Sequence, residues 1–134
     1  MSYESEHNEL RSRFNDQWGD TTPVAWPDVT FNPENLTVPW VRFSIQDGNS
    51  KQLTIGADNN PHRCFGQVSI QIFIPLGQGD ATALQLADAA AGIFRNWRGT
   101  NIVCRQPLSG AGGPDGQGWY MLPVTIPFHR DELF

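Results

Sequence analysis

Residues 64–94 restrict the possible folds of this chain more than any other segment. In residues 64–74, valine and isoleucine alternate with mostly polar residues, a period of two that predicts a β-strand with one buried face. A proline and two glycines then end the pattern, and an alanine-rich segment with helical spacing follows. Asp80 precedes that helix as a candidate N-cap, and Gly99 is a candidate stop. A strand leading directly into an apolar helix favours helices packed on a sheet.

A second, amphipathic helix is predicted for residues 3–18. One stripe of this helix collects its larger side chains at spacings of three and four, and the charged residues lie off that stripe. The stripe contains Tyr3, His7, Leu10, Phe14 and Trp18, whereas Glu4, Glu6, Glu9, Arg11 and Arg13 lie off it.

The remaining segments predict strands and turns. The proline-rich residues 21–39 predict an extended connection with at best a short edge strand at "PVAW". Further strands are predicted at residues 40–46 and 101–106, with residues 51–55 returning as a hairpin partner after a turn at 47–50. Residues 109–118 predict a loop, and residues 119–128 a strand. Because Pro123 and Pro127 lack N–H donors, that last strand is expected at an edge or with a bulge.

The order of these elements predicts an α+β fold: one mainly antiparallel, mixed sheet packed by two helices. The length of 134 residues suits one domain, so residues 1–134 are expected to form a single unit. The core is expected to include Phe43, Ile70, Ile72, Leu84 and Phe94.

Charge and hydropathy exclude several classes of function. The net charge of −5 leaves no basic surface for nucleic acid. The first residues are polar and charged, so no signal peptide is expected, and no apolar run approaches the roughly 20 residues of a membrane-spanning helix. We therefore expect a soluble, cytosolic chain rather than a membrane protein.

Sites for catalysis, metals and cofactors find little support. Cys64 and Cys104 are expected to be reduced and packed near strands, although either could serve as a nucleophile beside a histidine. These cysteines and the two later histidines match no zinc-binding spacing. "GAGGPDGQG" lacks the Lys-Ser/Thr of a phosphate loop and precedes a strand. The sequence thus predicts no enzyme and no cofactor.

Two further kinds of site remain open as weaker alternatives. Paired carboxylates could act in acid–base chemistry, but the candidate aspartates fall mostly at turns or helix caps. Exposed tryptophans could stack on sugars, which would make the chain a small carbohydrate-binding module. The residues concerned are Asp58, Asp80, Asp88 and Asp115 for the carboxylates, and Trp26, Trp40, Trp97 and Trp119 for the tryptophans.

Four segments in this order resemble the phage tail terminator family, specifically its small branch. They are "VAWP", "PWVRFSI", "GQVSIQIFIPLGQG" and "GWYMLPVTIPF". Each alone is ordinary strand and turn chemistry, but their order and spacing are specific, and the resemblance extends from about residue 3 to residue 128. The charged end "HRDELF" departs from it, because such chains often end soon after the last strand.

The resemblance implies a structural virion protein without catalysis. Such proteins form a ring, usually of six copies, on the head-proximal end of the tail tube. The ring stops tube polymerisation and presents the surface to which the filled head docks. The partners implied are further copies of the chain, the tail tube protein and a head completion protein, while DNA passes through the ring without specific binding. A neighbouring head–tail joining protein is the main alternative, because both classes share small α+β folds.

A ring requires two different contact patches on each subunit. The polar face of residues 64–74 and the loops at 47–63 and 108–118 are unused by the expected core, and they supply the candidate interface residues. These are Lys51, Asp58, Arg63, Gln67, Gln71 and Asp115. Lys51 and Arg63 in particular are expected to contact a neighbouring copy or the tube.

Overall fold

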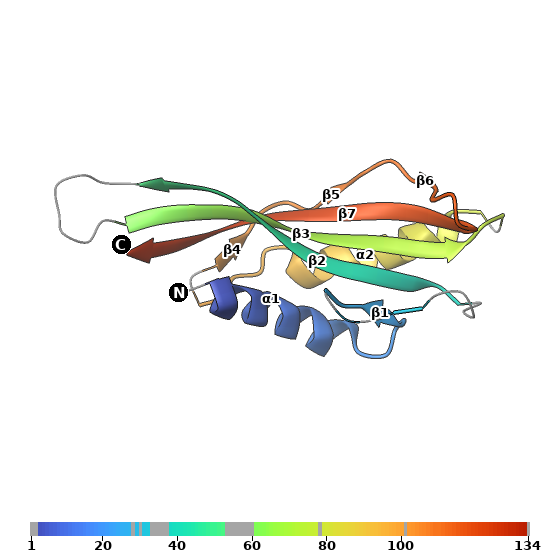
Figure 1. Ribbon diagram of the computed structural model, residues 1–134, viewed down its shortest axis with the longest axis horizontal. Coiled ribbons are helices and arrows are strands. Elements are labelled where there is room, and N and C mark those ends of the chain that lie inside the picture. The colour runs from blue at the N-terminus through green and yellow to red at the C-terminus, as the bar shows by residue number, and fades with distance from the viewer. Residues whose placement is uncertain are drawn as a thin grey trace.

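The structure is a computed structural model in which two helices pack on one long, twisted sheet (Figure 1). It describes residues 3–27, 29, 31–32, 38–52, 61–77, 79–100 and 102–133. Along the chain the elements are α1 (Tyr3–Trp18), β1 (Val24–Ala25), β2 (Trp40–Gln52), β3 (Pro61–Pro75), α2 (Ala81–Phe94), β4 (Ile102–Cys104), β5 (Leu108–Ser109), β6 (Gly113–Pro114) and β7 (Trp119–Leu133).

The sheet has seven strands in the order β1-β2-β3-β7-β4, and β5 and β6 also pair with β7. β1 runs parallel to β2, and every other pairing is antiparallel. This arrangement confirms the predicted α+β fold with a mixed, mainly antiparallel sheet.

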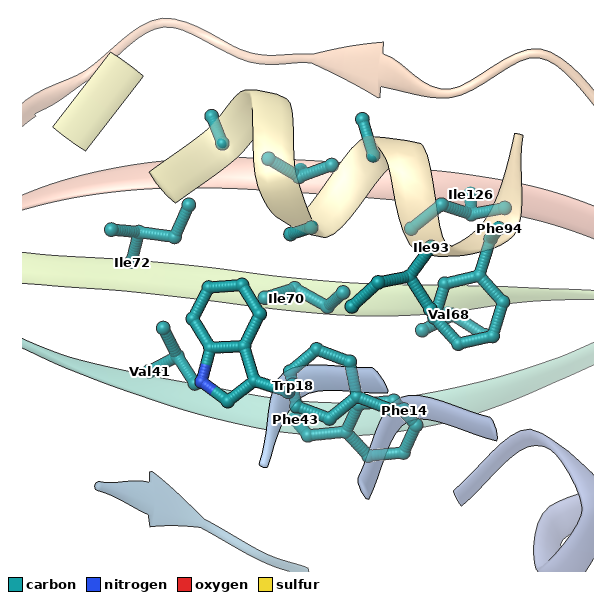
Figure 2. Close-up of a cluster of buried hydrophobic side chains, with 14 of the residues drawn as sticks. Phe14, Trp18, Val41, Phe43, Val68, Ile70, Ile72, Ile93, Phe94 and Ile126 are labelled. Carbon is teal, nitrogen blue, oxygen red and sulfur yellow. The ribbon is translucent and has the colours of Figure 1, made fainter. Parts of the chain in front are cut away.

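Both helices pack against the same face of the sheet, and the main core lies between the two layers (Figure 2). Phe14 of α1 is central to it, with ring centroids 5.0 Å from Phe43 of β2 and 6.4 Å from Phe94 of α2. The alternation in β3 is as predicted, because Val68, Ile70, Ile72 and Ile74 all face this core.

α1 ends at Trp18, as predicted, and Leu10, Phe14 and Trp18 are buried on its core face. Glu6 departs from the prediction: it was expected off the apolar stripe but is only 1% exposed. The reason is a buried partner on β7, described below.

α2 differs from its prediction at both ends and on one face. It ends at Phe94, before the expected stop at Gly99, and Asp80 makes no side-chain cap hydrogen bond. Leu84 was expected in the core but is 47% exposed, whereas Ala83 is fully buried. The small alanine allows α2 to lie close to the sheet, and the helix is rotated so that Leu84 faces outward.

β2 is longer than expected, and the predicted hairpin at residues 47–50 is wrong. The strand continues through these residues and pairs with β3 along its length, with only a register shift between Asp47 and Ser50. Gly48 and its neighbours therefore form an irregularity within a strand rather than a reversal of the chain.

β7 lies inside the sheet, which corrects the prediction of an edge or bulged strand. Its register with β3 is continuous from Trp119 to Leu133.

The carbonyls of Pro123 and Pro127 accept hydrogen bonds from Gly110 and Arg105, on the side away from β3. Because N–H and C=O of one strand residue point to the same side, the missing proline donors also face that side. There the pairing is divided among three short strands. One of these, β6, lies within the expected loop 109–118.

The three long strands extend beyond the helices at one end of the molecule (Figure 1). This three-stranded arm consists of residues 51–52, 61–63 and 131–133, in which Lys51 pairs with Arg63 and Arg63 with Asp131. The charged end of the sequence, which had no assigned role, thus extends β7 and supplies one strand of the arm.

Candidate assembly surfaces

The predicted interface residues do not form one site. Lys51 and Arg63 are register neighbours on the arm, and Asp58 lies outside the described residues. Asp115 is near the opposite end of β7, where its carboxylate accepts N–H bonds from Gln117 at 2.7 Å and Trp119 at 3.1 Å. Asp115 thus has a local role in shaping the turn before β7.

Arg63 makes a two-point contact on the arm. Its Nε lies 3.0 Å and its second nitrogen 3.3 Å from the carboxylate oxygens of Asp131. These hydrogen bonds lower the pKa of Asp131, although both side chains are largely solvent-exposed. An exposed pair of this kind stabilises the fold only weakly.

Gln67 and Gln71 lie on the sheet face that the helices leave open. Gln67 donates a hydrogen bond of 2.6 Å to the side chain of Gln46 on β2. A cross-strand row of Ser44, Ser69 and Thr125 lies between the two glutamines. At this row the open face is polar and uncharged, whereas toward the start of β2 it carries Arg42, whose guanidinium lies 5.5 Å from the ring centroids of Trp40 and Phe73.

Farther toward the arm, Arg105, Phe65 and His129 form a cluster that the sequence prediction missed. The guanidinium of Arg105 lies 5.4 Å from the ring centroid of Phe65, and its nitrogen is 3.4 Å from Nδ1 of His129. Burial and the nearby Arg63 and Arg105 lower the pKa of His129. The register of β3 with β7 pairs Phe65 with His129, and the hydrogen bond from the Arg105 N–H to the carbonyl of Pro127 places Arg105 beside β7. Both contacts depend on the fold, so the sequence alone offered no signal.

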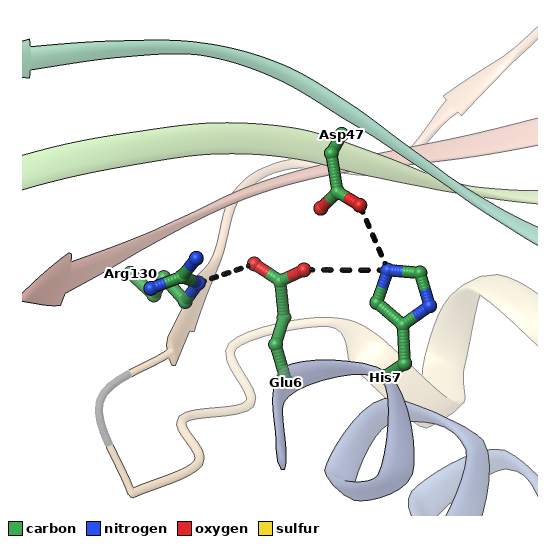
Figure 3. Close-up of polar contacts among 4 residues, drawn as sticks. All are labelled: Glu6, His7, Asp47 and Arg130. Carbon is green, nitrogen blue, oxygen red and sulfur yellow. Dashed lines mark hydrogen bonds and ion pairs between the residues drawn. The ribbon is translucent and has the colours of Figure 1, made fainter. Parts of the chain in front are cut away.

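A buried polar cluster joins α1 to the root of the arm (Figure 3). Nε of Arg130 donates to Oε1 of Glu6 at 2.8 Å, and both side chains are 1% exposed. Nε2 of His7 lies 2.9 Å from Oδ2 of Asp47 and 3.5 Å from Oε2 of Glu6. The cluster therefore links α1, β2 and β7 at the point where the helices end and the arm begins.

The cluster shifts the protonation of its two carboxyl groups in opposite directions. Burial, with the adjacent Asp47 carboxylate, raises the pKa of Glu6 to about 8 despite Arg130. Burial alone would raise the pKa of Asp47 as well, but hydrogen bonds from Glu6 and His7 lower it. At neutral pH the proton shared by this pair thus resides mainly on Glu6.

The same cluster is the group of potential metal ligands found among the described residues. One ligand atom each from Glu6, His7 and Asp47 lies within 4.8 Å of the other two. Arg130 already occupies Oε1 of Glu6, and a proton can balance the remaining charge. The geometry of these side chains is thus explained by contacts that hold α1 against β2 and β7, without a metal ion.

The cysteines and tryptophans are arranged for packing. Cys64 and Cys104 are free and buried, as predicted, and burial raises the pKa of the Cys104 thiol to about 12, which disfavours a thiolate nucleophile. Trp40 and Trp119 are buried with Phe73 on the open face. Trp26 and Trp97 pack against the main core. The tryptophans therefore form no exposed platform for a sugar ring.

Two hollows lie at opposite edges of the sheet. The first, of about 170 Å³, lies between α2 and β5, and the second, of about 350 Å³, lies between α1 and the segment that follows β1. We call them the α2 groove and the α1 hollow. The α2 groove is lined by Leu84, Ala87, Asp88, Ala91, Arg95, Pro107, Leu108, Ser109 and Val124, and the α1 hollow by Arg11, Ser12, Asn15, Trp26, Pro27 and Val29.

Comparison with known families identifies the type of protein to which this fold and these surfaces belong. A family model described as phage tail terminator protein matches residues 7–128. The chain belongs to the phage tail terminator family. Membership confirms the resemblance seen in the sequence and assigns the chain to the tail of a phage particle as a structural component. Family membership indicates a tail component rather than a known class of enzyme.

Solved structures support the fold of this tail terminator family member. Twenty-six chains match, and one of them superimposes with a TM-score of 0.61 at 19% identity, covering 92% of this chain and 94% of its own length. At 19% identity the likeness concerns the fold alone. A comparison with curated proteins gave no match. Among the described residues, no helix is long and apolar enough to cross a membrane.

Proposed function

We propose that residues 1–134 act as one unit that caps the head-proximal end of a phage tail tube. About six copies form a ring, stop the addition of tube subunits, and present the surface to which the filled head docks. The family match over residues 7–128 carries this proposal.

The shape of the chain supports a role between two different partners. The long strands give the molecule two distinct ends (Figure 1). The arm, with the Arg63–Asp131 pair, extends from one end. Val38 and Leu76 are 47% and 49% exposed at the other end, where β2 begins and β3 ends. A cap on a tube needs such a difference, because one side faces the tube protein and the other a head completion protein.

The charge of the chain supports passage of DNA through the ring. Six copies at −5 each carry about −30 in total. A surface of this sign repels the phosphate backbone and allows DNA to slide without binding. The chain would be synthesised in the host cytoplasm and retained in the virion at the junction of head and tail.

Capping is tested directly with purified tube protein. Adding the chain to growing tubes should stop elongation at one end, with about one ring per tube seen by negative-stain electron microscopy. Arm variants Lys51→Glu with Arg63→Glu should cap less well if the arm contacts the tube or a neighbouring copy. Unchanged capping by this variant would reject only the proposed role of the arm. Tubes that continue to grow in the presence of the unmodified chain would contradict capping itself.

A further inference from the structure

The two hollows differ in composition and lie at opposite edges of the sheet, which is the arrangement that a head-to-tail contact requires. β1 lies at one edge of the sheet and β5, which pairs with the far side of β7, lies at the other (Figure 1). The α1 hollow is lined by the segment that follows β1, and the α2 groove is lined in part by β5. A heterologous contact joins two different patches and closes into a ring when the rotation between copies allows it.

The α2 groove has the surface of a helix that is covered by a partner. Leu84 and Leu108 on its rim are 47% and 57% exposed. Within α2, Asp88 is the one charged residue on the exposed side, and Arg95 follows directly after the end of the helix. Gly92 also lies on this side, and a Cβ added there would meet no atom within 4 Å. Glycine in a helix costs about 1 kcal/mol relative to alanine, and no contact within the described chain requires it.

The α1 hollow provides a surface that complements the α2 groove. Trp26 and Pro27 line it, and Val29 on its rim is 59% exposed. Arg11 lines the same hollow and is exposed. Among the described residues, the side chains of Arg11 and Asp88 take part in no ion pair or hydrogen bond. Each hollow thus has exposed apolar side chains on its rim. The α1 hollow carries the charge of Arg11, and the α2 groove carries Asp88, of opposite sign, with Arg95 at the C-terminal end of the helix.

We propose that the α2 groove of one copy binds the α1 hollow of the next copy. Leu84 and Leu108 pack against Trp26 and Val29 across this contact, and Asp88 pairs with Arg11. The occupant is a second copy of the chain because the apolar surfaces and the two charges match each other. The inference rests on the proposed function, for which it names the ring contact.

Charge reversal tests the pairing in phage that lack the gene and receive it on a plasmid. Asp88→Arg and Arg11→Asp, each alone, should reduce the yield of infectious particles about tenfold or more, because each places like charges opposite one another. Combined in one chain, the two changes restore the pair with reversed sign, and the yield should recover to near that of the unmodified gene.

A matched control separates this contact from general effects of charge. Asp20→Arg makes the same change at an exposed residue that lines neither hollow and should complement fully. Thermal unfolding of each purified variant verifies that both single reversals remain folded. Leu84→Ser removes the apolar contact without altering charge and should also reduce the yield.

Two results would overturn the proposal. Normal yields from both single reversals would show that these surfaces are not in contact. Single reversals that fail without recovery in the double variant would indicate that one surface binds a different protein. The proposed function fails separately if phage without the gene produce normal tails, because that result does not depend on which surfaces meet.

Discussion

At the scale of single residues, the hydrogen bond between Glu6 and Arg130 joins the most buried acidic and basic side chains of the described chain. Both side chains are 1% exposed, and Arg130 joins the last strand to the first turn of α1. Removing the Glu6 carboxyl group takes one hydrogen bond from the buried guanidinium of Arg130, a loss that costs about 1–3 kcal/mol. The hydrogen bond between Glu6 and Arg130 therefore fixes the position of β7, where the arm begins, relative to α1.

The raised pKa of Glu6 predicts how stability depends on pH. Between its ordinary value of 4.5 and about 8, Glu6 retains its proton in the folded chain but loses it in the unfolded chain. The contribution of this group to the free energy of unfolding is therefore greatest below pH 4.5 and falls as the pH rises toward 8. Glu6→Gln should flatten this decline in melting temperatures measured from pH 5 to 8.5.

Asp131→Asn is the control for this prediction. Asp131 has a lowered pKa, so its contribution is present above its ordinary value of 3.8 and is lost only at lower pH. Asp131→Asn should therefore leave the slope of melting temperature against pH unchanged from pH 5 to 8.5. Equal slopes for the unmodified chain and Glu6→Gln would show that Glu6 is not protonated in this way.

Sequence patterns predicted many of the buried residues but not those with partners far along the chain. Phe43, Ile70, Ile72 and Phe94 lie in the core as expected, because the spacing of apolar residues alone determines which face of the strand or helix is buried. Glu6 was misplaced because its partner is 124 residues away. Leu84 was misplaced because Ala83 fits closer to the sheet, a choice made by packing rather than by hydrophobicity.

At the scale of elements, the close packing of β2, β3 and β7 leaves no space beside Gly66. A Cβ added there would lie 2.7 Å from Cζ of Phe128 and 2.9 Å from the backbone oxygen of Gln46. Gly66→Ala is therefore expected to reduce the free energy of unfolding by about 1–3 kcal/mol. Denaturant-induced unfolding of the purified chain measures this change.

Gly92→Ala gives the opposite expectation within the same experiment. No atom lies within 4 Å of the added methyl, so the helix should gain up to about 1 kcal/mol. If Gly66→Ala were as stable as the unmodified chain, the three strands would not be packed as described.

The elements were predicted best where one local period extends over many residues. α1 and the core of β3 needed only such a pattern. The turn residues at 47–50 misled the prediction, because the pairing of β2 with β3 overrides local turn chemistry. The two prolines of β7 misled it for a related reason: their missing donors face the interrupted side of the sheet, which only the topology reveals.

At the scale of the whole molecule, no short motif encodes the surfaces that we propose for assembly. Arg11 and Asp88 are far apart in the sequence, and they line hollows at opposite edges of the sheet. Of the candidate residues chosen from the sequence, Arg63 lies on the arm and Gln67 and Gln71 on the open face, while Asp115 is engaged in its own turn. Family membership could be inferred from ordered segments along the chain, but its contact surfaces required the fold.

The most direct test of tube capping is the length distribution of tails in a phage from which this gene has been deleted. Electron microscopy of the lysate should show free tails of irregular and excessive length beside filled heads without tails, and a plasmid copy of the gene should restore one uniform length. Tails of normal length that fail to join heads would contradict termination and indicate a joining protein instead. Normal virions would contradict an essential role in the tail altogether.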